Sequence, residues 1–246
     1  MKEKLYTIPV NDAFSQDCEC PLCIMRKTLE DNAIEYTMGP SYMEDDVRIE
    51  TDRLGFCRIH MTALSKQKNK LGLALILKTH MDRTIKEVKE RAQKPVKAGG
   101  LFKKATENPV ADYIEQLNHS CFICDRINNT FNRYITTVLH LWKHDAAFRD
   151  TVKKSKGFCT EHFGVLMREG QNALNSSEYA EFVSVLTKLY LENMQRVTDD
   201  VEWFTDKFDY RHADAPWKNS KDAIPRAIIK TNGIIEEEEK KQNGGQ

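Results

Sequence analysis

The sequence lacks the short motifs that mark many enzyme families. It contains no glycine-rich phosphate-binding loop, no Gly-x-Ser-x-Gly nucleophile motif and no His-Glu-x-x-His motif. No spaced pair of carboxylates suggests a catalytic acid and base. These absences favour a protein that is not an enzyme, although a missing motif does not exclude catalysis.

The sequence also lacks long apolar runs. A membrane helix needs about 20 consecutive apolar residues, and no segment approaches that length. Residues 1–10 have neither the apolar stretch nor the small-residue cleavage site of an export signal. We expect a cytoplasmic protein without membrane contact.

The chain has no excess of charge of either sign, because 37 Lys and Arg residues balance 37 Asp and Glu residues. The charges are unevenly spread, however, and segment 66–104 holds twelve basic residues against three acidic ones. Such a segment can bind nucleic acid, but charge runs alone are weak motifs. A solvated helix face followed by a linker is the interpretation we favour, with nucleic-acid binding as an alternative.

What the sequence does contain is a Cys/His pattern that occurs twice. Thirty-three residues separate Cys23 from Cys57 in the first copy, and thirty-four separate Cys124 from Cys159 in the second. The copies read Cys20-Pro-Leu-Cys23 with Gly55-Phe-Cys57-Arg-Ile-His60, and Cys121-Phe-Ile-Cys124 with Gly157-Phe-Cys159-Thr-Glu-His162. In a chain without an export signal, this spacing is typical of metal ligation and not of disulfides. Cys18 is left over, and we interpret it as a bystander thiol.

Three thiolates and one imidazole form a closed tetrahedral set, which suits structural zinc. We expect each copy to bind its own ion, so that the chain carries two zinc sites. The expected ligands are Cys20, Cys23, Cys57 and His60 in the first copy, and Cys121, Cys124, Cys159 and His162 in the second. An iron–sulfur cluster with one His ligand and a redox-active C-x2-C pair remain alternatives.

The apolar pattern predicts an all-α fold. After the second C-x2-C, Ile127, Phe131 and Ile135 recur at four-residue steps. The pattern predicts further helices over 43–53, 71–91, 110–117, 145–154, 179–208 and 222–230. Only residues 6–10 resemble a strand.

The duplicated pattern divides the chain into two tandem pseudo-repeats, each held by a metal site. We expect a first repeat over 1–93, a linker over 94–108, a second repeat over 109–212, a C-terminal lid over 213–233 and a disordered tail over 234–246. The helix over 179–208 is long enough to be shared with a partner protein or a second copy of the chain.

These motifs, together with Asn219-Ser-Lys-Asp-Ala-Ile-Pro-Arg226, resemble an uncharacterised bacterial family, a domain of unknown function found mainly in anaerobic Firmicutes. The resemblance runs from Leu5 to about Gly233. It implies a bacterial protein without an established activity. Some members carry a label as ABC-transporter substrate-binding proteins, but this chain has neither a lipoprotein cysteine nor an alternating strand–helix pattern.

The sequence therefore favours a zinc-stabilised helical module that binds a partner. A redox protein built on the same cysteines comes second, and a nucleic-acid-binding protein third.

Overall fold

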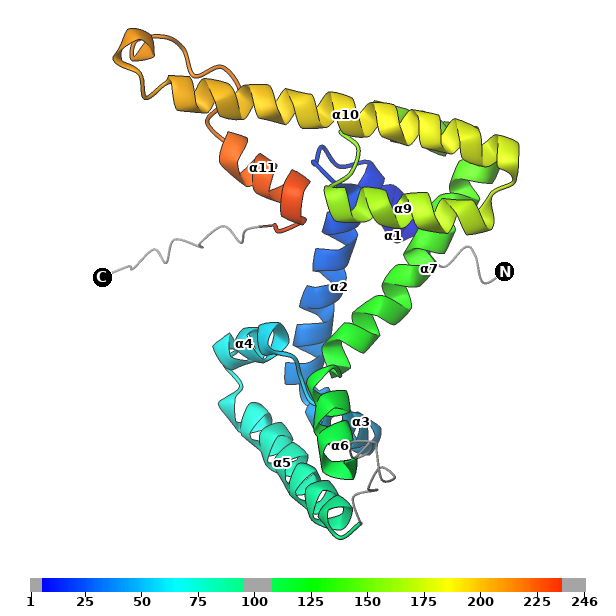
Figure 1. Cartoon of the computed structure of the whole chain (residues 1–246), viewed down its shortest axis with the longest axis vertical. Helices are drawn as coiled ribbons and strands as arrows, with labels where there is room; N and C mark the ends of the chain where they lie inside the picture. Colours follow the sequence, from blue (N-terminus) through cyan, green and yellow to red (C-terminus); the bar gives the residue numbers. More distant parts are fainter. Residues whose placement is uncertain (1–5, 95–107, 236–246) are drawn as a thin grey trace, which may run out of the picture. The chain divides into compact units, whose positions relative to one another are not determined.

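The computed structural model describes residues 6–94 and 108–235, and the chain is helical without strands over these ranges (Figure 1). This confirms the all-α prediction. Most of the expected linker (95–107) and of the expected tail (236–246) lies outside the described residues. No described helix combines the length and the apolar character needed to cross a membrane.

The described residues form eleven α-helices and two short 3-10 helices. They are α1 (Thr7–Phe14), α2 (Pro21–Met38), η2 (Pro40–Met43), α3 (Asp45–Leu54), α4 (Arg58–Lys66), α5 (Lys70–Ala92), α6 (Pro109–Asn118), α7 (Phe122–His144), α8 (Ala146–Lys154), α9 (Thr160–Ala173), α10 (Ser176–Asp206), η3 (Tyr210–His212) and α11 (Ala223–Asn232).

The chain forms two compact units. The central unit comprises residues 29–130, and the terminal unit comprises the residues before and after them. Helices α2 and α7 contribute to both units, because the division falls inside each helix. The units do not coincide with the predicted repeats over 1–93 and 109–212, since each repeat supplies chain to both.

The core of the central unit joins segments from both sequence copies. Val47, Leu54 and Leu64 from the first copy are buried together with Ile123 and Ile127 from the second. Two hydrogen bonds tie the same segments. The amide of Phe122 donates to the Gly55 carbonyl (3.0 Å), and Ser120 Oγ donates to the Leu54 carbonyl (2.7 Å).

The terminal unit packs α9 and α11 against the long helix α10 (Figure 1). An Asn175–Glu178 capping box starts α10, because each side chain accepts from the other residue's backbone amide. The Trp142 and Phe182 rings lie 5.0 Å apart and bring α7 onto α10. This unit therefore has an aromatic core of its own.

The strand-like stretch over 6–10 is a helix, so that expectation was wrong. Helix α1 buries Val10, Ala13 and Phe14, which follow three- and four-residue spacing. The apparent alternation was shorter than the helical pattern that continues beyond it. The helix expected over 71–91 is observed as α5, whose first turn is capped by the Asn69 side chain accepting from the Gly72 amide.

Candidate metal centres

The described residues contain two groups of three cysteines and one histidine. In each group the ligand atoms all lie within 4.8 Å of one another. Cluster 1 consists of Cys20, Cys23, Cys159 and His162 and belongs to the terminal unit. Cluster 2 consists of Cys57, His60, Cys121 and Cys124 and belongs to the central unit.

All eight predicted ligand residues enter these clusters, but the expected pairing within each copy was wrong. In cluster 1, the C-x2-C pair of the first copy meets the C-x2-His pair of the second. In cluster 2, the C-x2-C pair of the second copy meets the C-x2-His pair of the first. Cys18 lies in neither cluster and is half-buried. Whether the eight residues bind metal stays a prediction.

The long helices explain the crossed pairing. Each C-x2-C pair lies at the first turn of a long helix, α2 with 18 residues and α7 with 23. At 1.5 Å per residue, these helices carry the chain about 27 and 35 Å from their starts. The end of each long helix is therefore far from the C-x2-C pair at its start. The C-x2-His pair that comes next in sequence lies beside the C-x2-C pair of the other copy.

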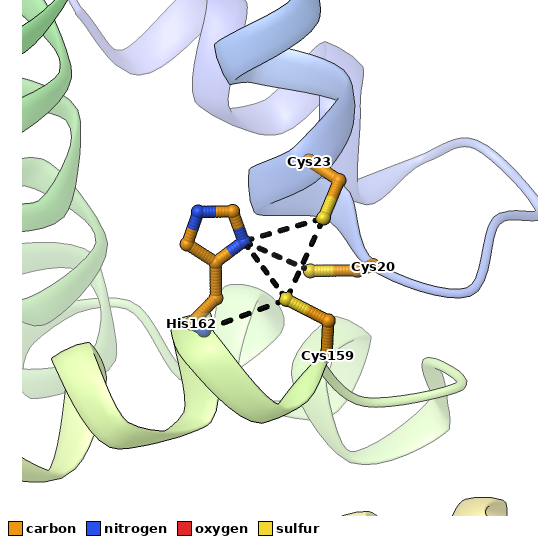
Figure 2. A group of neighbouring side chains, drawn as sticks. All are labelled: Cys20, Cys23, Cys159 and His162. Atoms are coloured by element: carbon orange, nitrogen blue, oxygen red, sulfur yellow. Dashed lines mark hydrogen bonds between the residues drawn. The ribbon is translucent and has the colours of Figure 1, made fainter. Parts of the chain in front are cut away.

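Cluster 1 converges on the Nδ1 atom of His162 (Figure 2). This nitrogen lies 3.4 Å from Cys20 Sγ and 3.3 Å from the sulfurs of Cys23 and Cys159. The Cys23 and Cys159 sulfurs are 3.6 Å apart. Cys159 is the N-cap of α9, and its sulfur accepts the His162 amide (3.4 Å), so the first turn of the helix places both ligands.

Cluster 1 is enclosed by protein. All four of its residues are buried, and the ring of Phe131 lies 5.3 Å from that of His162. His162 Nε2 is buried and has no hydrogen-bond partner among the described residues. At the end of α11, Gly233 has a φ of 69°, and a Cβ at this position would lie 3.4 Å from the sulfurs of Cys23 and Cys159. The C-terminal helix thus closes over the sulfurs.

A buried cation lies beside cluster 1. Lys230 is 1% exposed, and its ammonium donates to the carbonyls of Glu19 (2.8 Å) and Lys156. It also lies 3.3 Å from a Glu19 carboxylate oxygen, which Arg196 approaches to 2.5 Å. Burial lowers the pKa of Lys230, while Glu19 and Cys20 favour its charged form. Three thiolates around a divalent ion leave one negative charge, which this lysine complements.

The protonation preferences of the cluster 1 thiols reflect the crowding of three sulfurs. Burial raises the pKa of Cys20 to about 12, and hydrogen bonds with Cys159 and Cys20 raise that of Cys23. Hydrogen bonds with Cys20 and Cys23 lower the pKa of Cys159. A divalent cation is the group that would let all three ionise together.

Cluster 2 has the same arrangement of ligand atoms, but different residues surround it. His60 Nδ1 lies 3.3 Å from each of the three sulfurs. The Cys124 amide donates to Cys121 Sγ (3.5 Å), as expected at the start of a helix. His60 Nε2 lies 3.2 Å from a Glu30 carboxylate oxygen. A carboxylate on the second nitrogen of a ligating histidine fixes its tautomer and raises its basicity.

The electrostatics of cluster 2 differ between its thiols. Burial opposes ionisation of Cys121, but hydrogen bonds from His60 and nearby backbone outweigh it and lower the pKa to about 6. Burial and the neighbouring Cys121 raise the pKa of Cys124 to about 12. Burial disfavours charged His60, yet hydrogen bonds to Cys121 and Glu30 raise its pKa to about 10.

Sequence reasoning missed Glu30 and Lys230. Glu30 gave no signal, because its role depends on the part of α2 that reaches the central unit. Lys230 did give a signal, since it follows Ala223 by seven residues on the buried face of α11. A lysine on an apolar helical face indicates a buried charge partner.

In each cluster three sulfurs and one imidazole nitrogen, all from the protein, lie close enough together to hold one metal ion. No curated protein and no solved structure matches the chain. Residues 1–238 match the model of a family described as "Family of unknown function (DUF6062)". The chain therefore belongs to this family of unknown function.

Proposed function

We propose that clusters 1 and 2 each hold one structural zinc ion. The observation that carries this proposal is the spacing of the sulfurs. A Zn–S bond of about 2.3 Å in a tetrahedron separates two sulfurs by about 3.8 Å. The sulfurs of Cys23 and Cys159 are 3.6 Å apart, and those of Cys57 and Cys124 are 3.9 Å apart.

The same spacing disfavours an iron–sulfur cluster. Such a cluster places several iron and sulfide atoms between its protein ligands, and it therefore needs a wider cage. Donor atoms within 4.8 Å of one another leave room for a single ion. Two thiolate–imidazole sets of this size suit zinc before other metals.

Elemental analysis of anaerobically purified protein, with an absorption spectrum, tests the proposal. We expect about two zinc per chain and no visible absorption, as two closed sites require. Iron with a brown colour would overturn it, and so would protein folded without metal. Cys18→Ser is the matched control, because Cys18 lies outside both clusters and its loss should leave both ions in place.

We further propose that the zinc-stabilised scaffold binds a protein partner through an exposed aromatic surface at the end of α10. We call this surface the aromatic tip; its exposed members are Phe208 and Tyr210, and the half-buried Trp203, Phe204 and Trp217 complete it. Phe208 and Tyr210 are 75% and 87% exposed. Exposed aromatic side chains of this kind are enriched at protein interfaces.

The loop that carries the aromatic tip is held in place by hydrogen bonds. Lys207 Nζ donates to the carbonyls of His212 and Ala213, each at 2.7 Å, and Trp203 Nε1 donates to the Pro216 carbonyl at 3.0 Å. A preorganised surface loses less conformational entropy on binding. The exposed face of α10 itself is mainly polar, which gives a homo-oligomer along this helix little apolar surface.

A photo-crosslinking amino acid at position 208, just after α10, tests this part of the proposal, with position 188 on α10 as the control. We expect one protein to crosslink from position 208 only, and the purified partner to lose binding to the Phe208→Ser, Tyr210→Ser double variant. Equal crosslinking from both positions, or unchanged binding of the double variant, would contradict it.

Nucleic-acid binding has less support. Four basic side chains of α5 pair with acidic residues of the same helix: Lys78 with Asp82, Arg83 and Arg91 with Glu87, and Lys86 with Glu90. Paired charges bind phosphate weakly. Binding that falls steeply with salt would nevertheless indicate a nucleic-acid partner.

A further inference from the structure

A cleft of about 410 Å³ lies against cluster 2, and Cys57 is one of its lining residues. Both Cys57 and Cys124 are half-buried, whereas every residue of cluster 1 is buried. The sulfurs of these two residues are neighbours, 3.9 Å apart. Cluster 2 therefore has an edge of two half-buried cysteines, one of which, Cys57, borders the cleft.

The exposed edge also lacks the hydrogen bonds that reduce the reactivity of a metal-bound thiolate. Cys159 in cluster 1 and Cys121 in cluster 2 each accept a backbone amide. Over the described part of the chain, no backbone amide donates to Cys57 Sγ or Cys124 Sγ. More electron density therefore remains on these two sulfurs, which makes them the stronger nucleophiles.

Polar groups line the cleft beside Cys57. Arg58 is exposed, and His80 Nδ1 donates to the Asp52 carbonyl at 2.8 Å. The His80 ring lies directly against Gly55, because a Cβ on that glycine would be 2.7 Å from the ring. At the corresponding Gly157, the neighbour is Leu189. A guanidinium and an imidazole thus lie near the reactive edge of cluster 2, whereas the nearest atoms to Gly157 are the carbonyl group and Cβ of Leu189.

We propose that Cys57 is a modification site for small peroxides, with Cys124 as the resolving thiolate. The Cys57 thiolate attacks one peroxide oxygen, the O–O bond breaks, a sulfenic acid forms and hydroxide leaves. The Cys124 thiolate then attacks the sulfenic sulfur, a disulfide forms and a second hydroxide leaves. Two sulfurs are oxidised by two electrons in total, peroxide is reduced to two hydroxides that take protons from solvent, and the zinc of cluster 2 is released.

This inference rests on the proposed zinc sites, and the first measurement separates the two. Zinc is counted in the untreated full-length protein, where about two per chain are expected. Hydrogen peroxide is then added stepwise, the released zinc is followed with a colorimetric chelator, and the cysteines are mapped by mass spectrometry. We expect one zinc to be released first, together with a Cys57–Cys124 disulfide.

The possible outcomes divide clearly. Absence of zinc in the untreated protein refutes the proposed sites themselves. If two zinc ions are present but leave together, or if Cys20, Cys23 or Cys159 is oxidised first, the modification site is wrong while the zinc proposal stands.

The His80→Leu variant, which copies the residue at cluster 1, should slow Cys57 oxidation and leave the zinc count at two. An unchanged oxidation rate would show that the cleft does not assist the reaction.

Discussion

Clusters 1 and 2 contain the same four donors in the same local arrangement, yet their surroundings differ. Cluster 1 is buried throughout, lies under the end of α11 and has the buried ammonium of Lys230 beside it. Cluster 2 has two half-buried sulfurs, a cleft and a carboxylate on its histidine. One ligand motif can therefore serve as an enclosed structural site and as an accessible one, depending on what packs around it.

The histidines show the difference most directly. His60 has Glu30 on its second nitrogen, whereas His162 has the face of Phe131 nearby and no partner for Nε2 over the described ranges. A carboxylate strengthens a ligating imidazole, and an apolar surround excludes water and competing ligands. The two clusters are thus expected to hold zinc by different means.

The largest expected effect comes from testing the crossed pairing itself. The Cys20→Ser, Cys159→Ser double variant removes two ligands from cluster 1 and should retain one zinc per chain. The Cys20→Ser, Cys57→Ser variant damages both clusters and should lose both ions, with destabilisation on the order of 5 kcal/mol or more. Zinc analysis and thermal unfolding measure this. If the first variant lost both ions and the second kept one, the four ligands of each site would come from the same sequence copy.

The next effect concerns Lys230, the buried charge beside cluster 1. Lys230→Met leaves Glu19 without one of its two cations and removes the ammonium donor from the carbonyls of Glu19 and Lys156. We expect a loss of about 3 kcal/mol in the free energy of unfolding. Chemical denaturation measures it, with the exposed Lys188→Met on α10 as the control. Equal stability of the two variants would mean that the charge beside cluster 1 is unimportant.

A smaller effect is expected at the histidine of cluster 2. Glu30→Gln keeps the size of the side chain but removes its charge, and it should weaken zinc binding at cluster 2 by about 10- to 100-fold. Competition with a chromophoric chelator resolves the two sites. Glu35→Gln, an exposed position on the same helix, should change neither site. If zinc binding weakened at cluster 1 and not at cluster 2, Glu30 would support His162 and not His60.

The smallest effect compares the glycines that precede each Phe-Cys pair. Gly55 and Gly157 have φ values of 58° and 74°, so alanine is strained at both. A Cβ on Gly55 would also meet the His80 ring at 2.7 Å, whereas one on Gly157 would meet Leu189 at 3.4 Å. Gly157→Ala should cost about 1 kcal/mol and Gly55→Ala about 1 kcal/mol more. Thermal unfolding tests this order, and a reversed order would contradict the packing at Gly55.

Much of the fold could be predicted because it depends on local patterns. The helix expected over 145–154 is α8, and Asp145 caps it through the amides of Ala147 and Phe148. The C-x2-His pairs lie at the first turns of α4 and α9, since a Cys N-cap and a His three residues later share one helical face. The strand-like interpretation of residues 6–10 was wrong because five residues are too few to distinguish an alternating pattern from a helical one.

The sequence by itself determined the eight candidate ligands, their grouping into four local pairs and the helices that carry them. The two ligands of each pair lie three positions apart, and the backbone of one turn fixes such a distance. The tertiary structure alone decided which pairs meet, because that depends on where α2 and α7 end and on the core that joins Leu54 to Ile123. It also decided which cluster is enclosed, since Lys230 and Gly233 reach cluster 1 from more than sixty residues away in sequence. Local spacing predicts a ligand pair, but its partner and its exposure are properties of long-range packing.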